Sequence, residues 1–246
     1  MKIDFKGQKV LITGGNSNLG KKVIELLLKN NAYVYTTVTE IKKIKNLKNN
    51  NKNKIKFFEL NYKNSKSVQN FINEVKKIDY IDVLINNAGI NIIDNISNIK
   101  NKDWIDIQNV NLTGPFMLMR EISKKMIKKK KGNILNISSI FGSVGKEKRS
   151  SYSSSKWGLI GLTKSASLDL AKYNILVNAL SPGVINSSLT KKILGSEGIK
   201  DIKTQIPLRR LSNVEEIAKI ILFLISNHNT YLTGQNIIVD GGYTCG

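Results

Sequence analysis

Short apolar runs alternate along the chain with longer segments in which apolar residues recur every three or four positions. Apolar runs of about four to eight residues are typical of buried strands, and the longer spacing is typical of helices that bury one face. The strand-like runs are residues 9–13, 33–38, 55–60, 82–85, 132–137, 175–180 and 235–240. Helical spacing covers residues 21–29, 65–77, 102–131, 157–171 and 214–225.

This alternation predicts an α/β fold in which right-handed crossovers join parallel strands and helices cover both faces of the sheet. We therefore expect a Rossmann-type, doubly wound parallel sheet of about seven strands. At 246 residues and 41% hydrophobic composition, the chain is expected to form a single domain, residues 1–246.

Residues 13–20, TGGNSNLG, join the first predicted strand to the first predicted helix. A strand, a glycine-rich turn and a helix N-terminus in this order are typical of dinucleotide sites, because backbone N–H groups there receive the pyrophosphate. A glycine-rich loop alone is also an ordinary tight turn, so further motifs are needed to support a nucleotide site.

Tyr152 and Lys156 lie four residues apart, which places both side chains on one face of a helix. A free phenol has a pKa near ~10, and an ammonium one turn away favours the phenolate and lowers that pKa. Ser139 follows the run 132–137, at the strand edge where open α/β sheets bind ligands, and its hydroxyl can hold a substrate oxygen. The alternative is a flexible serine-rich loop with a stray tyrosine, which the helical spacing of 157–171 disfavours.

Taken in order, TGGNSNLG, the NNAG of 86–89, the NVNLTG around Asn111, and Ser139 with Tyr152 and Lys156 resemble the motifs of the short-chain dehydrogenase/reductase family. The resemblance covers nearly the whole chain. It implies that Tyr152 is the general acid in reduction and that Ser139 positions the carbonyl. It further implies that Lys156 lowers the Tyr152 pKa and holds the nicotinamide ribose, while the Asn111 backbone holds a water that links Lys156 to solvent.

The resemblance also implies the contacts to an NAD(P)(H) cofactor. Besides Tyr152 and Lys156, the residues expected there are Gly14, Asn16, Ser17, Asn18, Leu19, Gly20, Thr39, Asn61, Tyr62, Asn87, Ala88, Gly89, Pro182, Gly183, Val184, Ile185 and Ser187. Asn18 stands where the family has its middle glycine, and asparagine tolerates the left-handed backbone better than other non-glycine residues.

The choice of cofactor depends on the residues just after the second strand, where an acid bonds the NAD ribose and a basic neighbour accepts the NADP 2′-phosphate. Val38 and Thr39 supply neither group. Thr37 and Thr39 can donate hydrogen bonds to the 2′-phosphate, and Lys42 and Lys43 add positive potential near it. Two residues argue against NADP: Glu40 is a competing carboxylate, and Ser17 stands where many NADP-dependent relatives have an Arg. We expect a modest preference for NADP(H) over NAD(H), and Val38→Asp to move it toward NAD(H).

The implied activity is an NAD(P)(H)-dependent interconversion of a ketone and a secondary alcohol. A 3-oxoacyl carrier-protein reductase is one candidate; the others are a reductase of a sugar or small alcohol and a catalytically idle nucleotide-binding member. Residues 188–205 are expected to form a variable lid over the substrate. Gly195 and Gly198 suit hinges, although plain surface-loop glycines are equally common. The helices 102–131 and 152–172 correspond to those that pair between subunits in relatives, which implies a homotetramer or homodimer.

The net charge of +21 is large. Nucleic-acid binding would explain it, but the lysines are scattered and no nucleic-acid module accompanies them, so we expect solvated lysines on helix faces instead. Attraction of anionic substrates or cofactors is a third interpretation. The densest run, residues 128–131, fits a helix C-terminus and could also favour an acidic carrier protein.

Other parts of the sequence indicate a cytoplasmic protein. No apolar stretch comes after the first residues, so no signal peptide is expected, and the densest apolar run, 217–225, is too short to span a bilayer. Cys245, the single cysteine, excludes an internal disulfide. His228 is expected at the surface, and we expect neither a metal site nor a membrane partner.

Overall fold

The computed structural model describes residues 3–41 and 53–245 of the chain. In this part of the chain, seven parallel strands form one sheet in the order β3-β2-β1-β4-β5-β6-β7. The strands are β1 (Lys9–Ile12), β2 (Tyr33–Val38), β3 (Ile55–Glu59), β4 (Val83–Asn86), β5 (Gly132–Ile137), β6 (Ile175–Pro182) and β7 (Asn236–Val239). The doubly wound parallel sheet expected from the sequence is confirmed.

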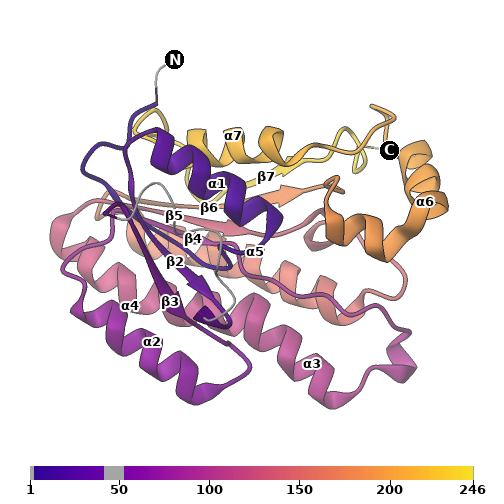
Figure 1. The fold of residues 1–246 in the computed structure, drawn as a ribbon, viewed down its shortest axis with the longest axis horizontal. Helices are drawn as coiled ribbons and strands as arrows, with labels where there is room; N and C mark the ends of the chain where they lie inside the picture. Colours follow the sequence, from indigo (N-terminus) through magenta and orange to yellow (C-terminus); the bar gives the residue numbers. More distant parts are fainter. Residues whose placement is uncertain (1–2, 42–52, 246) are drawn as a thin grey trace.

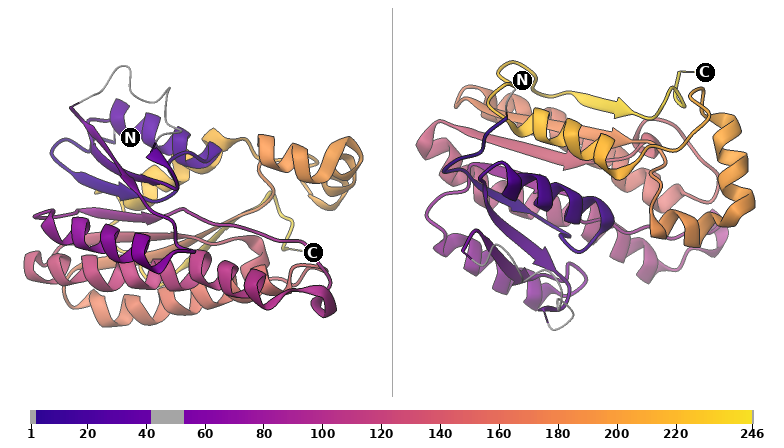
Figure 2. Two further views of the ribbon diagram at one scale, coloured as in Figure 1. Left: turned by 60° about the horizontal axis from the view of Figure 1, so that its bottom comes forward. Right: turned by 45° about the horizontal axis from the view of Figure 1, so that its top comes forward.

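Helices cover both faces of this sheet, as Figure 1 and Figure 2 show. The helices are α1 (Asn18–Lys29), α2 (Ser65–Lys77), α3 (Asn101–Gln108), α4 (Gly114–Lys129), α5 (Ser150–Ala171), α6 (Ser188–Gln205) and α7 (Val214–Ile225). Helices α1 and α7 pack on one face, whereas α2, α4 and α5 pack on the other. Helix α6 stands beyond the end of the sheet toward which β6 and β7 point.

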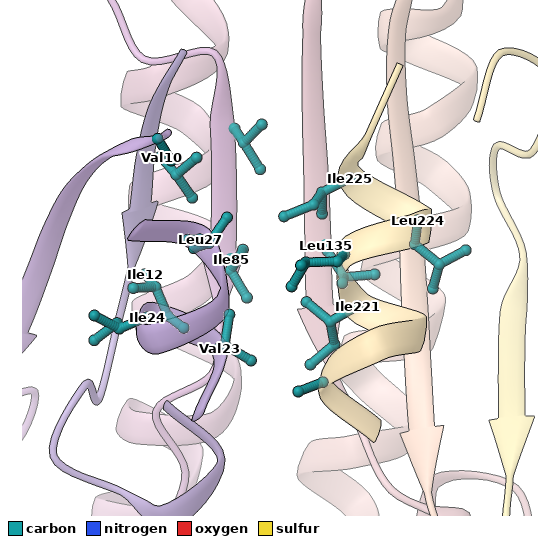
Figure 3. Packing of buried hydrophobic residues seen from close by; sticks show 14 of the residues in the cluster. Val10, Ile12, Val23, Ile24, Leu27, Ile85, Leu135, Ile221, Leu224 and Ile225 are labelled. Atoms are coloured by element: carbon teal, nitrogen blue, oxygen red, sulfur yellow. The ribbon is translucent and has the colours of Figure 1, made fainter. Parts of the chain in front are cut away.

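The core is divided into two layers by the sheet. Between the sheet and the α1–α7 pair, side chains such as Ile12, Val23, Leu27 and Ile221 are fully buried (Figure 3). Burying one such aliphatic side chain is worth about 1.5–3 kcal/mol. The apolar stripes of the helices pack here against the short apolar runs of the strands. This packing holds the strands and helices in place and so positions the loops at the carboxyl edge of the sheet.

The long helix predicted for 102–131 is interrupted. A π-helical turn, η3 (Asn109–Thr113), separates α3 from α4. The cause is local: Pro115 has no N–H, so the Asn111 carbonyl lacks its ordinary α-helical donor four residues on. Gly114 is required because a Cβ there would lie 2.4 Å from the Tyr62 ring.

Residues 188–205, expected as a variable lid, are helical. The helix bends at Gly195, whose φ of 65° and ψ of −173° are not helical. Gly195 therefore breaks the helix, whereas Gly198 lies inside a regular helical turn; the hinge roles expected of both glycines stay predictions. Within the described part of the chain, no helix is both long and apolar enough to cross a bilayer.

Candidate active site

The loops that follow β1, β2, β3, β4, β5 and β6 all leave the sheet at its carboxyl edge, since the strands are parallel. The chain order of the strands reverses between β1 and β4, and crevices at such a point are the usual ligand sites of open α/β sheets. The side chains expected to form a site come from these loops and from the N-terminal half of α5.

The glycine-rich loop after β1 is built around close backbone contacts. Gly14 has a φ of 68°, and a Cβ there would lie 3.0 Å from the Cα of Ala88. A Cβ on Gly20 would lie 2.4 Å from the Gly14 carbonyl oxygen. Ser17 caps α1 by accepting the Gly20 N–H at 3.0 Å. The loop leads directly into α1, so it brings the N-terminus of this helix to the groove.

Asn18 does not have the left-handed backbone that the sequence pattern suggested. It is the first residue of α1, and the left-handed residue of this loop is Gly14 instead. The Asn18 amide is exposed and donates to the Ser188 hydroxyl at 3.1 Å, which joins the loop to the start of α6. The adjacent Leu19 points into the core, so only its backbone faces the loop.

Asn87 ties the end of β4 to the glycine-rich loop. Its side-chain amide donates to the Thr13 carbonyl at 2.8 Å, to the Gly14 carbonyl at 3.2 Å and to the Ser17 hydroxyl at 3.2 Å. The Thr13 hydroxyl accepts the N–H groups of Asn87 and Ala88, each at 3.0 Å. Thr13 was not among the predicted site residues, because its partners lie more than seventy positions away in the chain.

A groove runs along this edge and contains nine of the residues expected at the cofactor. They are Gly14, Asn16, Ser17, Thr39, Asn61, Tyr62, Asn87, Ala88 and Gly89. Sequence reasoning missed one cation that also lines it: Lys63, which pairs with Asp106 at 3.1 Å. Tyr62 is mostly buried against Gly114, and burial raises the pKa of its phenol.

The groups at the end of β2 differ in how they face the groove. Thr37 is buried, and its hydroxyl accepts the Gly14 N–H at 3.2 Å, so it supports the loop. Val38 is also buried, with 2% of its surface exposed, which makes it a poor position for a new carboxylate. Thr39 is exposed and lines the groove. Lys42 and Lys43 lie outside the described residues.

Lys156 is the most constrained charged group of the site. Its side chain is buried, with 4% of its surface exposed, and its ammonium donates to the Ile137 carbonyl at the end of β5 at 2.8 Å. The Lys156 nitrogen lies 5.6 Å from the centre of the Tyr152 ring. Burial lowers the pKa of the Lys156 ammonium to about 8.

Tyr152 and Ser139 lie together at the start of α5. Burial raises the pKa of the Tyr152 phenol, and the hydroxyl of Ser139 and the charge of Arg149 act in the opposite direction. The Ser139 hydroxyl also accepts the Phe141 N–H at 3.2 Å. In the structure, Ser139 and Arg149 are therefore the groups that lower this pKa, whereas the sequence named Lys156; the Lys156 effect stays a prediction.

Asn111 is fully buried and holds the neighbouring loop by both ends of its amide. Its oxygen accepts the Ile90 N–H at 2.9 Å, and its nitrogen donates to the Ile90 carbonyl at 2.9 Å and to the Ser155 hydroxyl at 3.0 Å. The Asn111 side chain is thus occupied, and only its backbone, in the π-helical turn, can take part in a proton relay.

The segment after β6 forms the other end of the site. Gly183 packs so closely that a Cβ would lie 2.8 Å from the Asp240 Cα, and Ile185 bridges to Ser212. Ser187 caps α6 by accepting the Thr190 N–H at 3.1 Å. Of the expected residues here, Gly183 and Val184 line a separate pocket with Ile206 and Leu208, not the groove itself.

These features fit a dinucleotide. The glycine-rich turn has no room for side chains where backbone would approach a pyrophosphate, and a helix N-terminus and a buried lysine supply positive potential. Among the described residues, no three His, Cys, Asp or Glu side chains are grouped to hold a metal ion. Fold and site together define an oxidoreductase that acts on CH–OH groups with a nicotinamide cofactor.

A sequence model described as enoyl-(acyl carrier protein) reductase matches residues 14–244. The chain belongs to the short-chain dehydrogenase/reductase family. It is 37% identical over 247 residues to a 3-oxoacyl-[acyl-carrier-protein] reductase of Aquifex aeolicus (strain VF5), covering 98% of this chain and 99% of the relative. It is 39% identical over 240 residues to the reductase of the same name in Rickettsia typhi (strain ATCC VR-144 / Wilmington), covering 98% of each.

A solved structure of ElxO with NADP bound has the same fold. The TM-score is 0.89 at 34% sequence identity, and the match covers 97% of this chain and 99% of ElxO. These likenesses establish an NAD(P)-dependent oxidoreductase that interconverts a ketone and an alcohol.

The buried Lys156 predicts a pH-dependent stability. The folded-state pKa of Lys156, about 8, lies below the unfolded value of 10.5, so the unfolded chain binds more protons between these pH values. Stability should therefore rise with pH across this window. Relative to Lys156→Met, the free energy of unfolding of the natural chain should increase by about 2 kcal/mol from about pH 7 to about pH 9.5.

Urea unfolding at both pH values measures this difference. The exposed Lys164 on the same helix gives the control, because Lys164→Met removes a charge that stays in water in both states. A difference between the natural chain and Lys156→Met that does not change with pH would show that Lys156 is not a buried cation.

Proposed function

We propose that this chain reduces the 3-oxo group of an acyl thioester to a 3-hydroxyl group, with a modest preference for NADP(H), and that Asn111, Ser139, Tyr152 and Lys156 carry the reaction. The observation that supports it most is the placement of Lys156 beside Tyr152 at the carboxyl edge, with Ser139 acting on the same phenol. The names of the two relatives at 37% and 39% identity support the acyl substrate.

Each residue has a separate task. Ser139 donates its hydroxyl to the substrate carbonyl and orients it, while Tyr152 delivers a proton to the oxygen as it becomes an alkoxide. When bound, a reduced nicotinamide supplies the hydride, which is the chemistry that this chain's own side chains lack. Lys156 holds the ribose and favours the phenolate that Tyr152 becomes, and the backbone of Asn111 passes a proton from solvent through water.

The resting pKa values suit the direction of reduction. Tyr152 carries its proton near neutral pH; burial raises the pKa of its phenol, and Ser139 and Arg149, which lower that pKa, make the proton easier to donate. The ammonium of Lys156, with a pKa of about 8, is largely protonated there. Burial thus keeps Tyr152 protonated, while the Lys156 cation stays one helical turn away.

The substrate would enter from the side of α6. This helix, bent at Gly195 and joined to the cofactor loop through Asn18 and Ser188, is the proposed lid, and the chain is proposed to act as one domain. Lysines 128–131 directly precede β5 and so lie at the amino edge of the sheet, opposite this chain's own site; the positive surface that they offer an acidic carrier protein would serve the site of a second copy. The cytoplasm is the compartment in which we propose the reaction to occur.

Tyr152→Phe tests the catalytic assignment. The ring is kept and the proposed proton donor is lost, so turnover of an acetoacetyl thioester with NADPH should fall by ~100-fold or more. Binding of NADPH and the unfolding midpoint should stay near those of the natural chain. The loss of reduced-nicotinamide absorbance measures the rate.

Tyr173→Phe, which removes a hydroxyl just after α5, is the control. A crotonyl thioester and a small keto sugar complete the substrate panel. Turnover of the crotonyl thioester or the sugar without turnover of the acetoacetyl thioester would contradict the proposed substrate, and full activity of Tyr152→Phe would contradict the proposed mechanism.

Cofactor preference is tested at Thr39, since Val38 is buried. Thr39→Asp adds an exposed carboxylate that accepts hydrogen bonds from a ribose and repels a 2′-phosphate. The natural chain should bind NADPH several-fold more tightly than NADH, worth ~1 kcal/mol, and Thr39→Asp should reverse this order. Thr39→Asn has the same shape without the charge and should change it less. Tighter binding of NADH by the natural chain would contradict the preference.

A second copy of the chain is the proposed occupant of the face formed by α3, α4 and α5. Large apolar side chains on these helices are exposed: Trp104, Ile105, Phe116, Trp157 and Leu168. Such a row on adjacent helices is typical of a subunit interface. Light scattering should give two or four times 27.5 kDa at micromolar concentration.

Leu168→Glu, at a position with 80% exposure, should reduce this mass to that of a smaller species. Ile96→Glu is the control, because Ile96 has 79% exposure but lies outside these helices. A monomeric natural chain, or equal effects of both substitutions, would contradict the proposed interface.

A further inference from the structure

Arg149 lies beside the catalytic tyrosine and has no task in the proposed mechanism. It immediately precedes α5 and stands three residues before Tyr152. The guanidinium lies over the ring of Phe141, with its central carbon 6.0 Å from the ring centre. Phe141 stands two residues after Ser139, and its N–H donates to the Ser139 hydroxyl at 3.2 Å, so the guanidinium lies close to the segment that holds the reacting carbonyl.

The guanidinium is incompletely bonded. Its Nη1 atom is buried and has no hydrogen-bond partner, and no carboxylate of the described residues forms an ion pair with it. A buried guanidinium nitrogen without a partner is costly and rare, since a charged donor has lost its water and gained nothing in return. The loss of water also lowers the pKa of Arg149.

Unsatisfied polar atoms are concentrated at this point of the chain. Seven buried side-chain atoms of the described residues lack a partner, and four belong to Arg149, Ser150, Ser151 and Ser153. Of these atoms only the Arg149 nitrogen is charged, and a buried charged donor without a partner points to a ligand that completes it, because natural proteins pair nearly all buried polar atoms. The ligand must offer hydrogen-bond acceptors.

We propose that Arg149 is a specificity-determining residue that binds the second oxygen of a substrate whose reacting carbonyl is held by Ser139 and Tyr152. This rests on the proposed function and deepens it. In a 3-oxoacyl group, one methylene separates the reacting carbonyl from the thioester carbonyl, so the two oxygens lie a few ångströms apart. A guanidinium over the ring of Phe141, two residues from Ser139, is placed to reach the second oxygen while the first receives the proton.

The shared chemistry is an oxygen acceptor one methylene away from the reacting carbon, and two sources supply it. One is the thioester carbonyl of a 3-oxoacyl thioester, and the other is the carboxylate of a free 3-oxo acid. The carboxylate would form the stronger, charge-assisted pair with Arg149. A plain ketone of the same length lacks the second oxygen and leaves the guanidinium unpaired, so the site should reject it.

The test compares kcat/KM for an acetoacetyl thioester, free acetoacetate and a plain ketone with NADPH. Arg149→Gln removes the charge, and Arg149→Lys keeps the charge but loses the forked donor pair. Arg149→Gln should lose about 10- to 100-fold with whichever of the two oxo substrates the natural chain uses, and little with the plain ketone. Lys146→Gln, an exposed position in the same loop, should leave all rates unchanged.

Selectivity between substrates within one variant does not depend on the folded fraction of the preparation, so misfolding cannot imitate the effect. A loss confined to the thioester assigns the thioester carbonyl as the partner of Arg149, and a loss confined to acetoacetate assigns the carboxylate. An Arg149→Gln enzyme that keeps kcat/KM within about threefold for both oxo substrates would overturn the proposal.

A binding measurement separates this proposal from the proposed function. Calorimetry of an acetoacetyl thioester and of acetoacetate with the NADP-bound chain needs no turnover, and Arg149→Gln should weaken binding of whichever of the two the natural chain binds by about tenfold or more. Absence of thioester turnover with intact, Arg149-dependent binding would reject the proposed reaction but support the role of Arg149. Equal binding of these ligands by both proteins, or binding of neither ligand by the natural chain, would overturn that role.

Discussion

The structure of the site depends on one constraint, the burial of the Lys156 ammonium at the carboxyl edge of the sheet. A buried cation is tolerated only when its donors are met, and the Ile137 carbonyl meets one of them at 2.8 Å. That bond fixes the Lys156 nitrogen at the end of β5, 5.6 Å from the centre of the Tyr152 ring. Gly89 borders the space in front of the ammonium, where a Cβ would lie 3.6 Å from the Lys156 nitrogen, an ordinary contact distance.

The remaining polar residues hold the loops around this cation. Asn87 and Thr13 join the first and fourth strand ends, and Asn111 joins the loop after β4 to α5 through Ser155. Each of these hydrogen bonds joins two different elements, so together they hold the loops in fixed positions relative to the strands. The same burial lowers the pKa of Lys156 and raises that of Tyr152, so one environment disfavours the charged form of both groups.

Much of the fold could be predicted from periodicity alone. Four elements have the predicted bounds: the strands Tyr33–Val38 and Gly132–Ile137 and the helices Ser65–Lys77 and Val214–Ile225. Their patterns, a short apolar run for a strand and one apolar stripe for a helix, are local properties of the sequence. The spacing of Tyr152 and Lys156 on a helix was readable for the same reason. The π-helical form of the turn before Gly114 was not predicted, although its cause is local: Pro115 removes the donor that the Asn111 carbonyl would use in an α-helix. Contacts between distant segments, such as those of Thr13, Lys63 and Arg149, leave no local signal in the sequence. The backbone conformation of Asn18 was wrongly predicted because its helix begins earlier than the apolar pattern does.

The central claim is that this arrangement adds a hydride to a carbonyl carbon while Tyr152 protonates its oxygen. Reduction of an acetoacetyl thioester with NADPH deuterated at the transferred position, followed by mass spectrometry of the product, tests it most directly. One deuterium on the carbon that bears the new hydroxyl is the predicted result. A product without deuterium at that carbon would contradict the account.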